Sequence, residues 1–234
     1  MHASIYDINR KHTVDETYFS DIDTEQKAYW LGLLWADGHI SKTAPRCSGP
    51  NRLRITQKEQ ETALLEKFLE DLSSNYELKS NISQYGTISS QLDINSRPLC
   101  QSLERLGFAK KDQRCHIPKI PANLNRHFVR GYFDGDGCLS VYDQKRSNSV
   151  THRQEWSLTG DPKFIAEIKS LLETEADVTS TVSIKRYART DKAVTLRYGK
   201  ISDIEKLYSY LYDEATRYME SKHEKFMSYF SRRA

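Results

Sequence analysis

Two stretches of nine residues decide the fold of this chain. WLGLLWADG runs from Trp30 to Gly38, and VRGYFDGDG runs from Val129 to Gly137, at an offset of 99 residues. Glycine, aspartate and glycine fall at matching places in the two stretches. Such internal self-similarity indicates that one structural unit is present twice.

Further matches follow the two stretches along the chain. Residues 53–56 match 156–159 at an offset of 103, residues 91–94 match 195–198 at 104, and Lys111 matches Lys222 at 111. The offset grows only where loops are expected, which is typical of two copies whose connections have diverged.

Hydrophobic periodicity predicts the elements of each copy. Residues 23–26 form a capping box, the apolar stretch 28–35 is the helix that it starts, and Gly38 ends that helix. Strands are predicted at 39–44 and 51–57, a helix at 59–72, a hairpin in which Ile82, Leu92 and Ile94 alternate with polar residues, and a helix at 97–107. The second copy repeats this order from about residue 122 to residue 230.

The predicted fold class is therefore α+β, with two pseudo-symmetric αββαββα repeats and antiparallel sheets. The predicted domains are an N-terminal extension at 1–22, a first repeat at 23–115 and a second repeat at 116–234. In both repeats one face of the sheet is apolar and is covered by helices, whereas the other face is polar.

Composition limits the class of protein. The chain of 234 residues is 38% hydrophobic and contains no run of about 18 apolar residues, and its first residues lack the apolar segment of a signal peptide. A membrane protein and a secreted protein are thus not expected. The four cysteines form no CxxC pair and the seven histidines form no ligand set, so the cysteines are interpreted as reduced thiols inside the cell.

The position of the charges says more than the net charge of +3. Residues 39–58 carry five lysines and arginines and no acid, residues 59–76 are mainly acidic, and residues 179–200 are again basic. Any antiparallel sheet with one wet face would carry polar residues there, but the excess of cations on the strands favours a nucleic-acid surface. In the first repeat the candidate DNA-binding residues are Lys42, Arg46, Arg52, Arg54, Asn81, Ser83, Gln91, Asp93 and Asn95. In the second repeat they are Ser140, Tyr142, Lys145, Arg146, Arg153, Ser157, Ser183, Lys185, Arg186, Arg189, Lys192, Thr195 and Arg197.

The two stretches resemble the LAGLIDADG motif, and the repeat around each resembles the repeat of that family. The resemblance covers about residues 23 to 230 and includes two motif copies, as in the family's single-chain homing endonucleases. It implies two antiparallel sheets that form a DNA-binding saddle backed by helices, with the motif helices packed together between the repeats. It also implies a monomer that binds a long, asymmetric double-stranded DNA site, in the cytoplasm or in the organelle or nucleoid that holds this DNA.

The motif residues have a physical rationale. Glycine inside a helix costs about 1 kcal/mol relative to alanine, so Gly32 and Gly131 predict a close approach of the two motif helices. Asp37 and Asp136 would then emerge side by side at the negative ends of two helix dipoles, an arrangement that only cations make favourable. Hard oxygen ligands suit Mg²⁺, for which Mn²⁺ is a plausible substitute.

The family's functional residues transfer unevenly. The resemblance implies that Asp37 and Asp136 are metal ligands, assisted by the backbone carbonyls of Ala36 and Gly135. It implies that Gln57 organises water near the metal, although its counterpart is Gly160. It implies that Lys111 and Lys222 stabilise the charged phosphate. Because Lys110 adjoins Lys111, either of these two lysines could occupy the first position. Trp35 stands where the motif carries its first acid, which the second copy retains as Asp134.

Three functions remain open from the sequence. The first is a metal-dependent, site-specific double-strand DNA endonuclease that hydrolyses phosphodiester bonds. The second is an RNA-binding intron maturase on the same scaffold, and the third is a DNA-binding regulator without catalysis. Both motif aspartates are present, which counts against the third.

Overall fold

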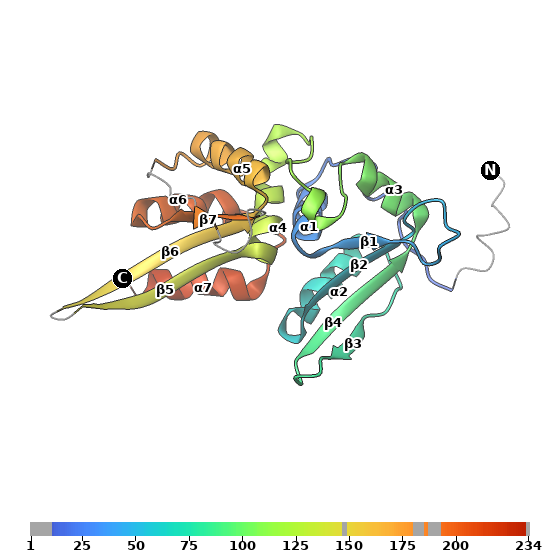
Figure 1. The fold of residues 1–234 in the computed structure, drawn as a ribbon, viewed down its shortest axis with the longest axis horizontal. Coiled ribbons are helices and arrows are strands. Elements are labelled where there is room, and N and C mark those ends of the chain that lie inside the picture. The colour runs from blue at the N-terminus through green and yellow to red at the C-terminus, as the bar shows by residue number, and fades with distance from the viewer. Residues whose placement is uncertain (1–10, 147–148, 180–184, 187–192, 233–234) are drawn as a thin grey trace. The chain divides into compact units, whose positions relative to one another are not determined.

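The chain folds into two compact units. The computed structural model describes residues 11–146, 149–179, 185–186 and 193–232 (Figure 1). The first unit comprises residues 1–21 and 38–105, and the second comprises residues 22–37 and 106–234. The first motif helix therefore lies in the second unit, where it packs along the second motif helix.

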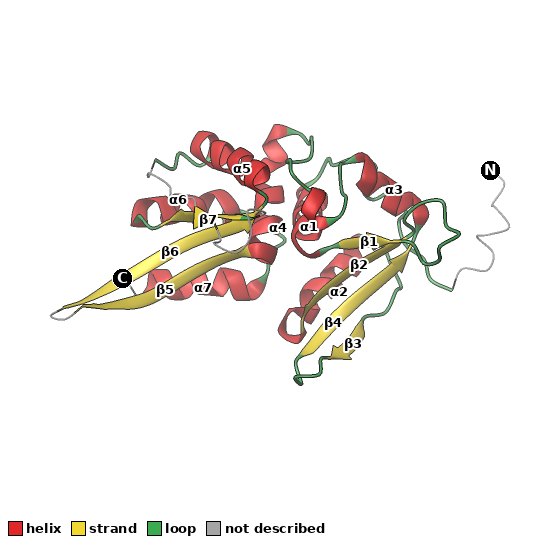
Figure 2. Ribbon diagram, viewed as in Figure 1, coloured by secondary structure: helices red, strands yellow, loops and turns green. Residues whose placement is uncertain are grey.

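The first unit is a four-stranded antiparallel sheet with two helices (Figure 2). The strand order is β1-β2-β4-β3, and helix α2 packs on β2 and β4. Its elements are β1 (His39–Ser41), β2 (Arg52–Lys58), a 3₁₀ turn η1 (Glu59–Glu61), α2 (Thr62–Asp71), β3 (Lys79–Ile82), β4 (Ile88–Asn95) and α3 (Arg97–Arg105).

The second unit contains the motif helices and the second four-stranded antiparallel sheet. The strand order β5-β6-β8-β7 has the same connectivity as that of the first sheet. Its helices are α1 (Glu25–Asp37), α4 (Asn125–Asp136), α5 (Pro162–Glu175), α6 (Ile201–Tyr212) and α7 (Glu220–Ser231), with 3₁₀ turns η2 (Lys111–Gln113) and η3 (Ala122–Leu124). Its strands are β5 (Gly137–Arg146), β6 (Ser149–Gly160), β7 (Lys185–Arg186) and β8 (Val194–Tyr198).

The registers of the two sheets repeat the sequence offsets. Equivalent residues face one another across equivalent strands in both units. The matching cross-strand pairs are His39–Arg54 with Cys138–Ser157, and Leu53–Ile94 with Trp156–Tyr198. The offsets of 99, 103 and 104 thus mark structurally equivalent positions, and the predicted α+β repeat architecture is confirmed. Helix α7, at the end of the predicted second repeat, is an addition to the predicted order of elements.

Each sheet buries one face under helices. In β2, Leu53 and Ile55 are buried, whereas Arg52 and Arg54 on the other face are half-buried and Thr56 is exposed. Trp156 and Leu158 of β6 are fully buried in the second unit. The predicted alternation of apolar and polar faces is therefore confirmed for these strands.

Several predicted boundaries shift for local reasons. Helix α1 begins one residue later than the predicted capping box requires, because the Thr24 hydroxyl accepts the bond from the Lys27 N–H at 3.3 Å. The first strand ends at Ser41, three residues early. Beyond it, the Thr43 backbone N–H donates to Asn51 Oδ1, and the Asn51 side-chain amide donates to the Thr43 hydroxyl across the loop. The prediction that Ile82 faces the core is wrong, since its side chain is 71% exposed near the tip of the β3–β4 hairpin.

Two predictions from composition can be compared with the described part of the chain. None of the helices seen there combines the length and the apolar character needed to cross a membrane. The four cysteines are free thiols, as interpreted from their spacing. Burial raises the pKa of the Cys100 thiol to about 12, so this residue acts as a small core side chain.

Candidate active site and nucleic-acid interface

The two motif helices touch through their glycines. A Cβ placed on Gly32 would overlap the Phe128 carbonyl oxygen and lie 2.9 Å from the Tyr132 nitrogen. A Cβ on Gly131 would overlap the Tyr29 carbonyl oxygen and lie 2.7 Å from the Leu33 nitrogen. Under the offset of 99 these two sets of neighbours are equivalent. The helices therefore pack backbone to backbone about a pseudo-twofold axis, as the sequence predicted.

The same contact continues to the ends of both helices. A Cβ on Gly135 would overlap the Ala36 side chain and lie 2.9 Å from Oδ2 of Asp37. The Asp37 carboxylate thus lies against the residue that precedes Asp136. Both carboxylates add to burial in raising the pKa of the Tyr132 hydroxyl, so both lie near it. The predicted gathering of the two aspartates at one helix end is what the structure contains.

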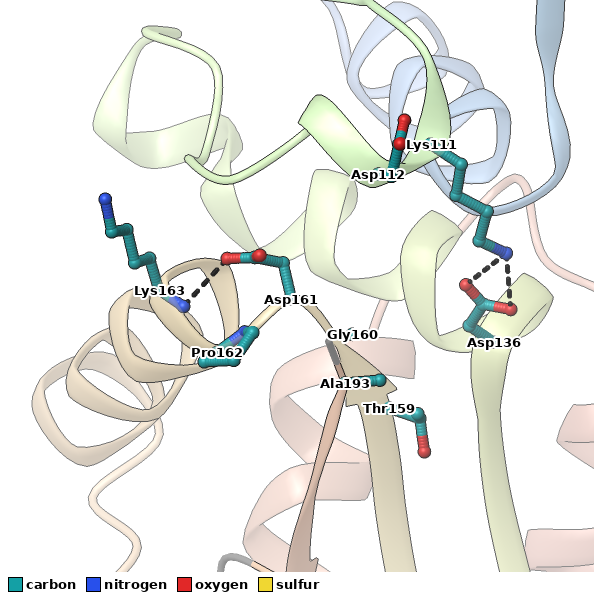
Figure 3. Close-up of a pocket in the computed structure, with 9 residues that line it drawn as sticks. All are labelled: Lys111, Asp112, Asp136, Thr159, Gly160, Asp161, Pro162, Lys163 and Ala193. Atoms are coloured by element: carbon teal, nitrogen blue, oxygen red, sulfur yellow. Dashed lines mark hydrogen bonds and ion pairs between the residues drawn. The ribbon is translucent and has the colours of Figure 1, made fainter. Parts of the chain in front are cut away.

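Lys111 contacts the second of these carboxylates. Its Nζ lies 2.9 Å from Oδ2 and 3.2 Å from Oδ1 of Asp136 (Figure 3). The lysine side chain is 61% exposed, and the short turn η2 holds it there. Of Lys110 and Lys111, it is therefore Lys111 that pairs with a motif aspartate.

Lys222 is held in a different way. It lies in α7, and its ammonium group donates to the Gly137 carbonyl and lies 5.7 Å from the centre of the Phe133 ring. Burial lowers the pKa of Lys222, and the nearby carboxylates of Asp134 and Asp37 oppose this effect. The equivalent lysines of the two repeats thus have unlike surroundings, one exposed and ion-paired, the other partly buried on a main-chain oxygen.

Arg114 is a site residue that sequence reasoning missed. Its guanidinium donates to the carbonyls of Leu34 at 3.2 Å and Trp35 at 2.6 Å, and it lies 3.8 Å from the centre of the Phe108 ring. It is 4% exposed, and burial lowers its pKa to about 10, against the opposing carboxylates of Asp136 and Asp37. A buried cation therefore caps the C-terminal end of α1 beside the paired aspartates. No pattern in the sequence marks this arginine.

The motif's first acidic position differs between the repeats. Asp134 is fully buried and accepts bonds from the hydroxyls of Tyr29 at 2.9 Å and Tyr212 at 2.6 Å and from the Met219 N–H at 2.7 Å. Burial raises its pKa to about 6 despite these bonds. Trp35 instead packs edge-on against the rings of Phe108 and Phe128. The departure from the motif thus replaces a buried hydrogen-bond network by an aromatic contact.

The remaining candidate catalytic residue lies in the first unit. Gln57 is on β2, on the same buried side as Leu53 and Ile55, with 9% of its surface exposed. Its counterpart, Gly160, ends β6 in the second unit.

The donor set at the helix ends fits a hydrated hard cation. The carboxylates of Asp37 and Asp136 lie there, and carboxylate oxygens are ligands that Mg²⁺ prefers. The described residues contain no group of three or more acidic, histidine or cysteine side chains that could hold a metal by themselves. A divalent ion bound here would keep water or substrate oxygens in several positions.

On the first unit, the candidate DNA-binding residues of the strands share one face of the sheet. The register places Arg52 opposite Asn95 and Arg54 opposite Asp93. Arg54 donates to both Asp93 oxygens, at 2.6 and 3.2 Å. The same face has a hollow of about 510 Å³ lined by Arg52, Arg54 and Lys79 among others. The other candidates there are Asn81 on β3 and Gln91 on β4, with Lys42, Arg46 and Ser83 in loops.

Asp93 is the centre of the polar network on this face. Partial burial opposes its ionisation, but hydrogen bonds from Arg54 and Gln91 hold the pKa of Asp93 below its ordinary value. Lys79 lies 3.6 Å from the same carboxylate. The network fixes the orientation of Arg54 before any ligand binds.

On the second unit, the candidates spread over β5, β6 and β8. Ser140 and Tyr142 lie on β5, with Tyr142 50% exposed, and Arg153 and Ser157 lie on β6. Arg197 pairs with Glu155 at 3.2 Å. Thr195 is buried and shares a 2.9 Å hydrogen bond with Thr159, so its hydroxyl does not face solvent. Only the backbone is described for Lys145, Arg146, Lys185 and Arg186, and Ser183, Arg189 and Lys192 lie outside the described residues.

The structure of this chain is similar to several solved structures. The structure is similar to the LAGLIDADG meganuclease I-AabMI bound to uncleaved DNA, with a TM-score of 0.57 and 16% identity over 83% of this chain and 86% of that one. It is similar to the LAGLIDADG homing endonuclease I-LtrWI bound to target DNA, with a TM-score of 0.59 and 14% identity over 92% and 90% of the two chains. It is also similar to the LAGLIDADG homing endonuclease I-SmaMI bound to cleaved DNA, with a TM-score of 0.56, 12% identity and 87% of both chains covered.

The fold is therefore that of the LAGLIDADG homing endonucleases, with two repeats in one chain. Residues 123–211 match the family model of the LAGLIDADG-like domain, which lies within the second repeat. No curated protein sequence matches the chain. The resemblance indicated by the two motifs is confirmed.

Proposed function

We propose that this chain is a site-specific double-strand DNA endonuclease that hydrolyses one phosphodiester bond in each strand. The observation that carries this proposal is the pair Asp37 and Asp136, brought together where two helices touch backbone to backbone. Two acids at adjoining helix C-termini are unfavourable unless cations lie beside them, and Lys111 and Arg114 of the chain itself provide part of this charge. A divalent ion would provide the rest. The similar structures I-AabMI, I-LtrWI and I-SmaMI are bound to DNA, which supports DNA as the substrate.

The proposed cofactor is Mg²⁺, with Mn²⁺ as a substitute. Asp37 and Asp136, with the backbone carbonyls of Ala36 and Gly135, would hold it. When bound, a divalent ion at such a site supplies an activated water and neutralises charge on the leaving oxygen. Without it, the two carboxylates would repel the phosphate of the substrate.

The chain's own residues supply the other parts of the site. Lys111, already at a motif carboxylate, would shift its contact to a non-bridging phosphate oxygen and offset the charge that develops during hydrolysis. Lys222, partly buried beside the same helix ends, would act in the second half of the site. Gln57 is the proposed residue that orients water near the metal.

The polar sheet faces would bind the DNA. A two-stranded ribbon fits the major groove, and arginine forks bind guanine edges while lysines contact phosphates. The faces of the two sheets carry different side chains, so the target is expected to be a long and asymmetric sequence. Because both motif copies lie on one chain, a monomer already holds both aspartates and no second copy is needed.

Two other functions are the alternatives to the endonuclease. A maturase on this scaffold would bind folded intron RNA through the same basic faces, and a silent regulator would bind DNA and leave it intact. Nothing in a regulator requires the paired acids, so their presence at the helix contact favours the endonuclease over it.

A cleavage assay separates these functions. The full-length protein is incubated in Mg²⁺ with a plasmid library that carries randomised inserts and with DNA that spans the intron-less insertion point of its own gene. Linear products are then sequenced. Asp37→Asn and Asp136→Asn, which keep shape and remove charge, are expected to abolish cleavage but retain binding. Asp213→Asn, an exposed aspartate at the end of α6, is the matched control and is expected to cut normally.

Cleavage by either motif variant at the wild-type rate would contradict the shared metal site. Binding of DNA without cleavage by the wild type would favour the regulator. Preference for the intron transcript over duplex DNA would favour the maturase.

A further inference from the structure

The two repeats differ at one pair of equivalent strand positions. Gln57 and Gly160 occupy the same place in β2 and β6, as the matching registers of the two sheets establish. The first repeat therefore brings a polar side chain to the end of its strand, whereas the second repeat brings none.

A tyrosine of the motif helix fills the space above Gly160. A Cβ on Gly160 would lie 2.7 Å from the hydroxyl oxygen of Tyr132 and 3.2 Å from the Ile165 side chain. The strand end thus has no room for a larger residue as long as the hydroxyl is present. Under the offset of 99, the counterpart of Tyr132 is Leu33, which has no hydroxyl.

The Tyr132 hydroxyl is bonded to the end of the strand. It donates to the Thr159 carbonyl at 2.9 Å, and the ring is 3% exposed. The hydroxyl therefore links the end of β6 to helix α4.

The cavity beside this link is lined by the groups that the proposed reaction needs. Its volume is about 630 Å³, and Asp136, Lys111, Thr159 and Gly160 line it (Figure 3). Thr159 and Gly160 come from the strand end that Tyr132 holds, and Asp136 comes from the helix that carries Tyr132. The hydroxyl thus joins the two elements that carry these sides of the cavity.

We propose that Tyr132 is a positioning residue for the site at the ends of the motif helices, beside the strand position at which the second repeat has Gly160 and the first repeat has Gln57. Its hydroxyl sets the spacing between the Thr159–Gly160 strand end and the Asp136 carboxylate, and so shapes the cavity that receives one of the two scissile phosphates. This inference rests on the proposed endonuclease function. Its consequence is that the cleavage of the two DNA strands depends on different residues.

Strand-specific cleavage tests the proposal. A cleaved site recovered from the plasmid library is labelled with a different dye on each strand, and the rate of each nick is measured in Mg²⁺. Tyr132→Phe removes one hydrogen bond, so it is expected to slow one strand by up to roughly tenfold and to leave the other nearly unchanged. Gln57→Leu is expected to slow the opposite strand. Tyr198→Phe, which removes a buried hydroxyl of the same unit, is the matched control and is expected to leave the ratio of rates unchanged.

A stability measurement gives a second readout without DNA or metal. Gly160→Ala is expected to lower the urea midpoint of the wild type because its Cβ meets the Tyr132 hydroxyl. The same change is expected to lower the midpoint less in the Tyr132→Phe background, where that oxygen is absent. Equal losses in both backgrounds would overturn the proposed contact.

The outcomes separate the inference from the function on which it rests. A wild-type protein that cuts no DNA overturns the endonuclease proposal and the strand assignment with it. A wild-type protein that cuts, but whose Tyr132→Phe variant slows both strands equally or neither, overturns the positioning role alone. Slowing of the same strand by Tyr132→Phe and Gln57→Leu also overturns it.

Discussion

Adding one methyl group at Gly131 is expected to destabilise the second unit. The new Cβ would lie 2.7 Å from the Leu33 nitrogen and would overlap the Tyr29 carbonyl oxygen. Ordinary contact needs about 3.5 Å, so α1 and α4 would have to separate by at least about 0.8 Å. Both clashing atoms are backbone, and no change of rotamer can relieve the overlap.

The size of the effect follows from two opposed contributions. Alanine is favoured over glycine in a helix interior by about 1 kcal/mol. Overpacking costs about 1–3 kcal/mol and more where the backbone must move. Since the backbones of two whole helices must move here, we expect Gly131→Ala to lower the free energy of unfolding by about 2 kcal/mol or more. Gly131→Leu is expected to cost several kcal/mol.

Urea unfolding followed by tryptophan fluorescence measures this loss. Trp30, Trp35 and Trp156 all lie in the second unit, so the signal reports on the unit that contains the helix contact. Gly32→Ala meets equivalent backbone atoms and is expected to cause a similar loss.

The controls define what would refute the reasoning. Gly49→Ala adds a Cβ in open space and is expected to leave the midpoint unchanged. The double variant of Gly32 and Gly131 is expected to lose less than the sum of the two single losses, because one separation of the helices relieves both overlaps. A Gly131→Ala variant more stable than the wild type would refute the backbone contact and the site built at its end.

Three further predictions test other parts of the structure. Burial lowers the pKa of His127 from its ordinary 6.5 to about 4. The folded protein is therefore most stable above pH 6.5, where the ring is neutral, and it loses this stability as the pH falls towards 4. The urea midpoint of His127→Gln is expected to fall less than that of the wild type between about pH 7 and about pH 4.5. Arg114→Met leaves two helix-end carbonyls without their donor and is expected to cost about 3 kcal/mol in the same unfolding assay, whereas no loss would contradict the capping role. Arg54→Ala is expected to reduce the preference for one base by about 1–3 kcal/mol in binding titrations against single-base variants of the site. Asp93→Asn, which weakens the ion pair that orients Arg54, is expected to reduce the preference at the same base position. Unchanged relative affinities would make Arg54 a phosphate contact or no contact.

The sequence predicted the parts of this protein that depend on short patterns. Positions 32 and 131 must be glycine because the backbones of the two helices touch there and leave no room for a side chain. A glycine inside an apolar helix is a signal of such a contact that can be read from the sequence. Alternation of Leu53 and Ile55 with arginines predicted the two faces of β2, since side chains alternate along any strand. Ile82 was misplaced because periodicity alone does not tell where the covering helix ends.

The site was predictable only where it belonged to the repeat. Asp37 and Asp136 follow from the doubled motif, and their placement side by side follows from the glycine contact. The sequence could not decide whether Lys110 or Lys111 is the lysine of the site, because the short turn that orients this side chain leaves no periodic pattern in the sequence. Arg114 was not found, since an arginine that caps a distant helix resembles any surface arginine in the sequence.

What the sequence determined by itself is the repeat, the helix pair and the identity of the paired acids, because all three depend on residues near one another in the chain or on an exact offset between copies. The tertiary structure alone decided how the copies differ. Asp134 sits in a buried network where Trp35 packs on aromatic rings, Lys222 bonds a carbonyl where Lys111 bonds a carboxylate, and the Tyr132 hydroxyl fills the space above Gly160. Each of these contacts joins residues that lie far apart in the chain or on different elements, and their energy depends on distances that only packing fixes.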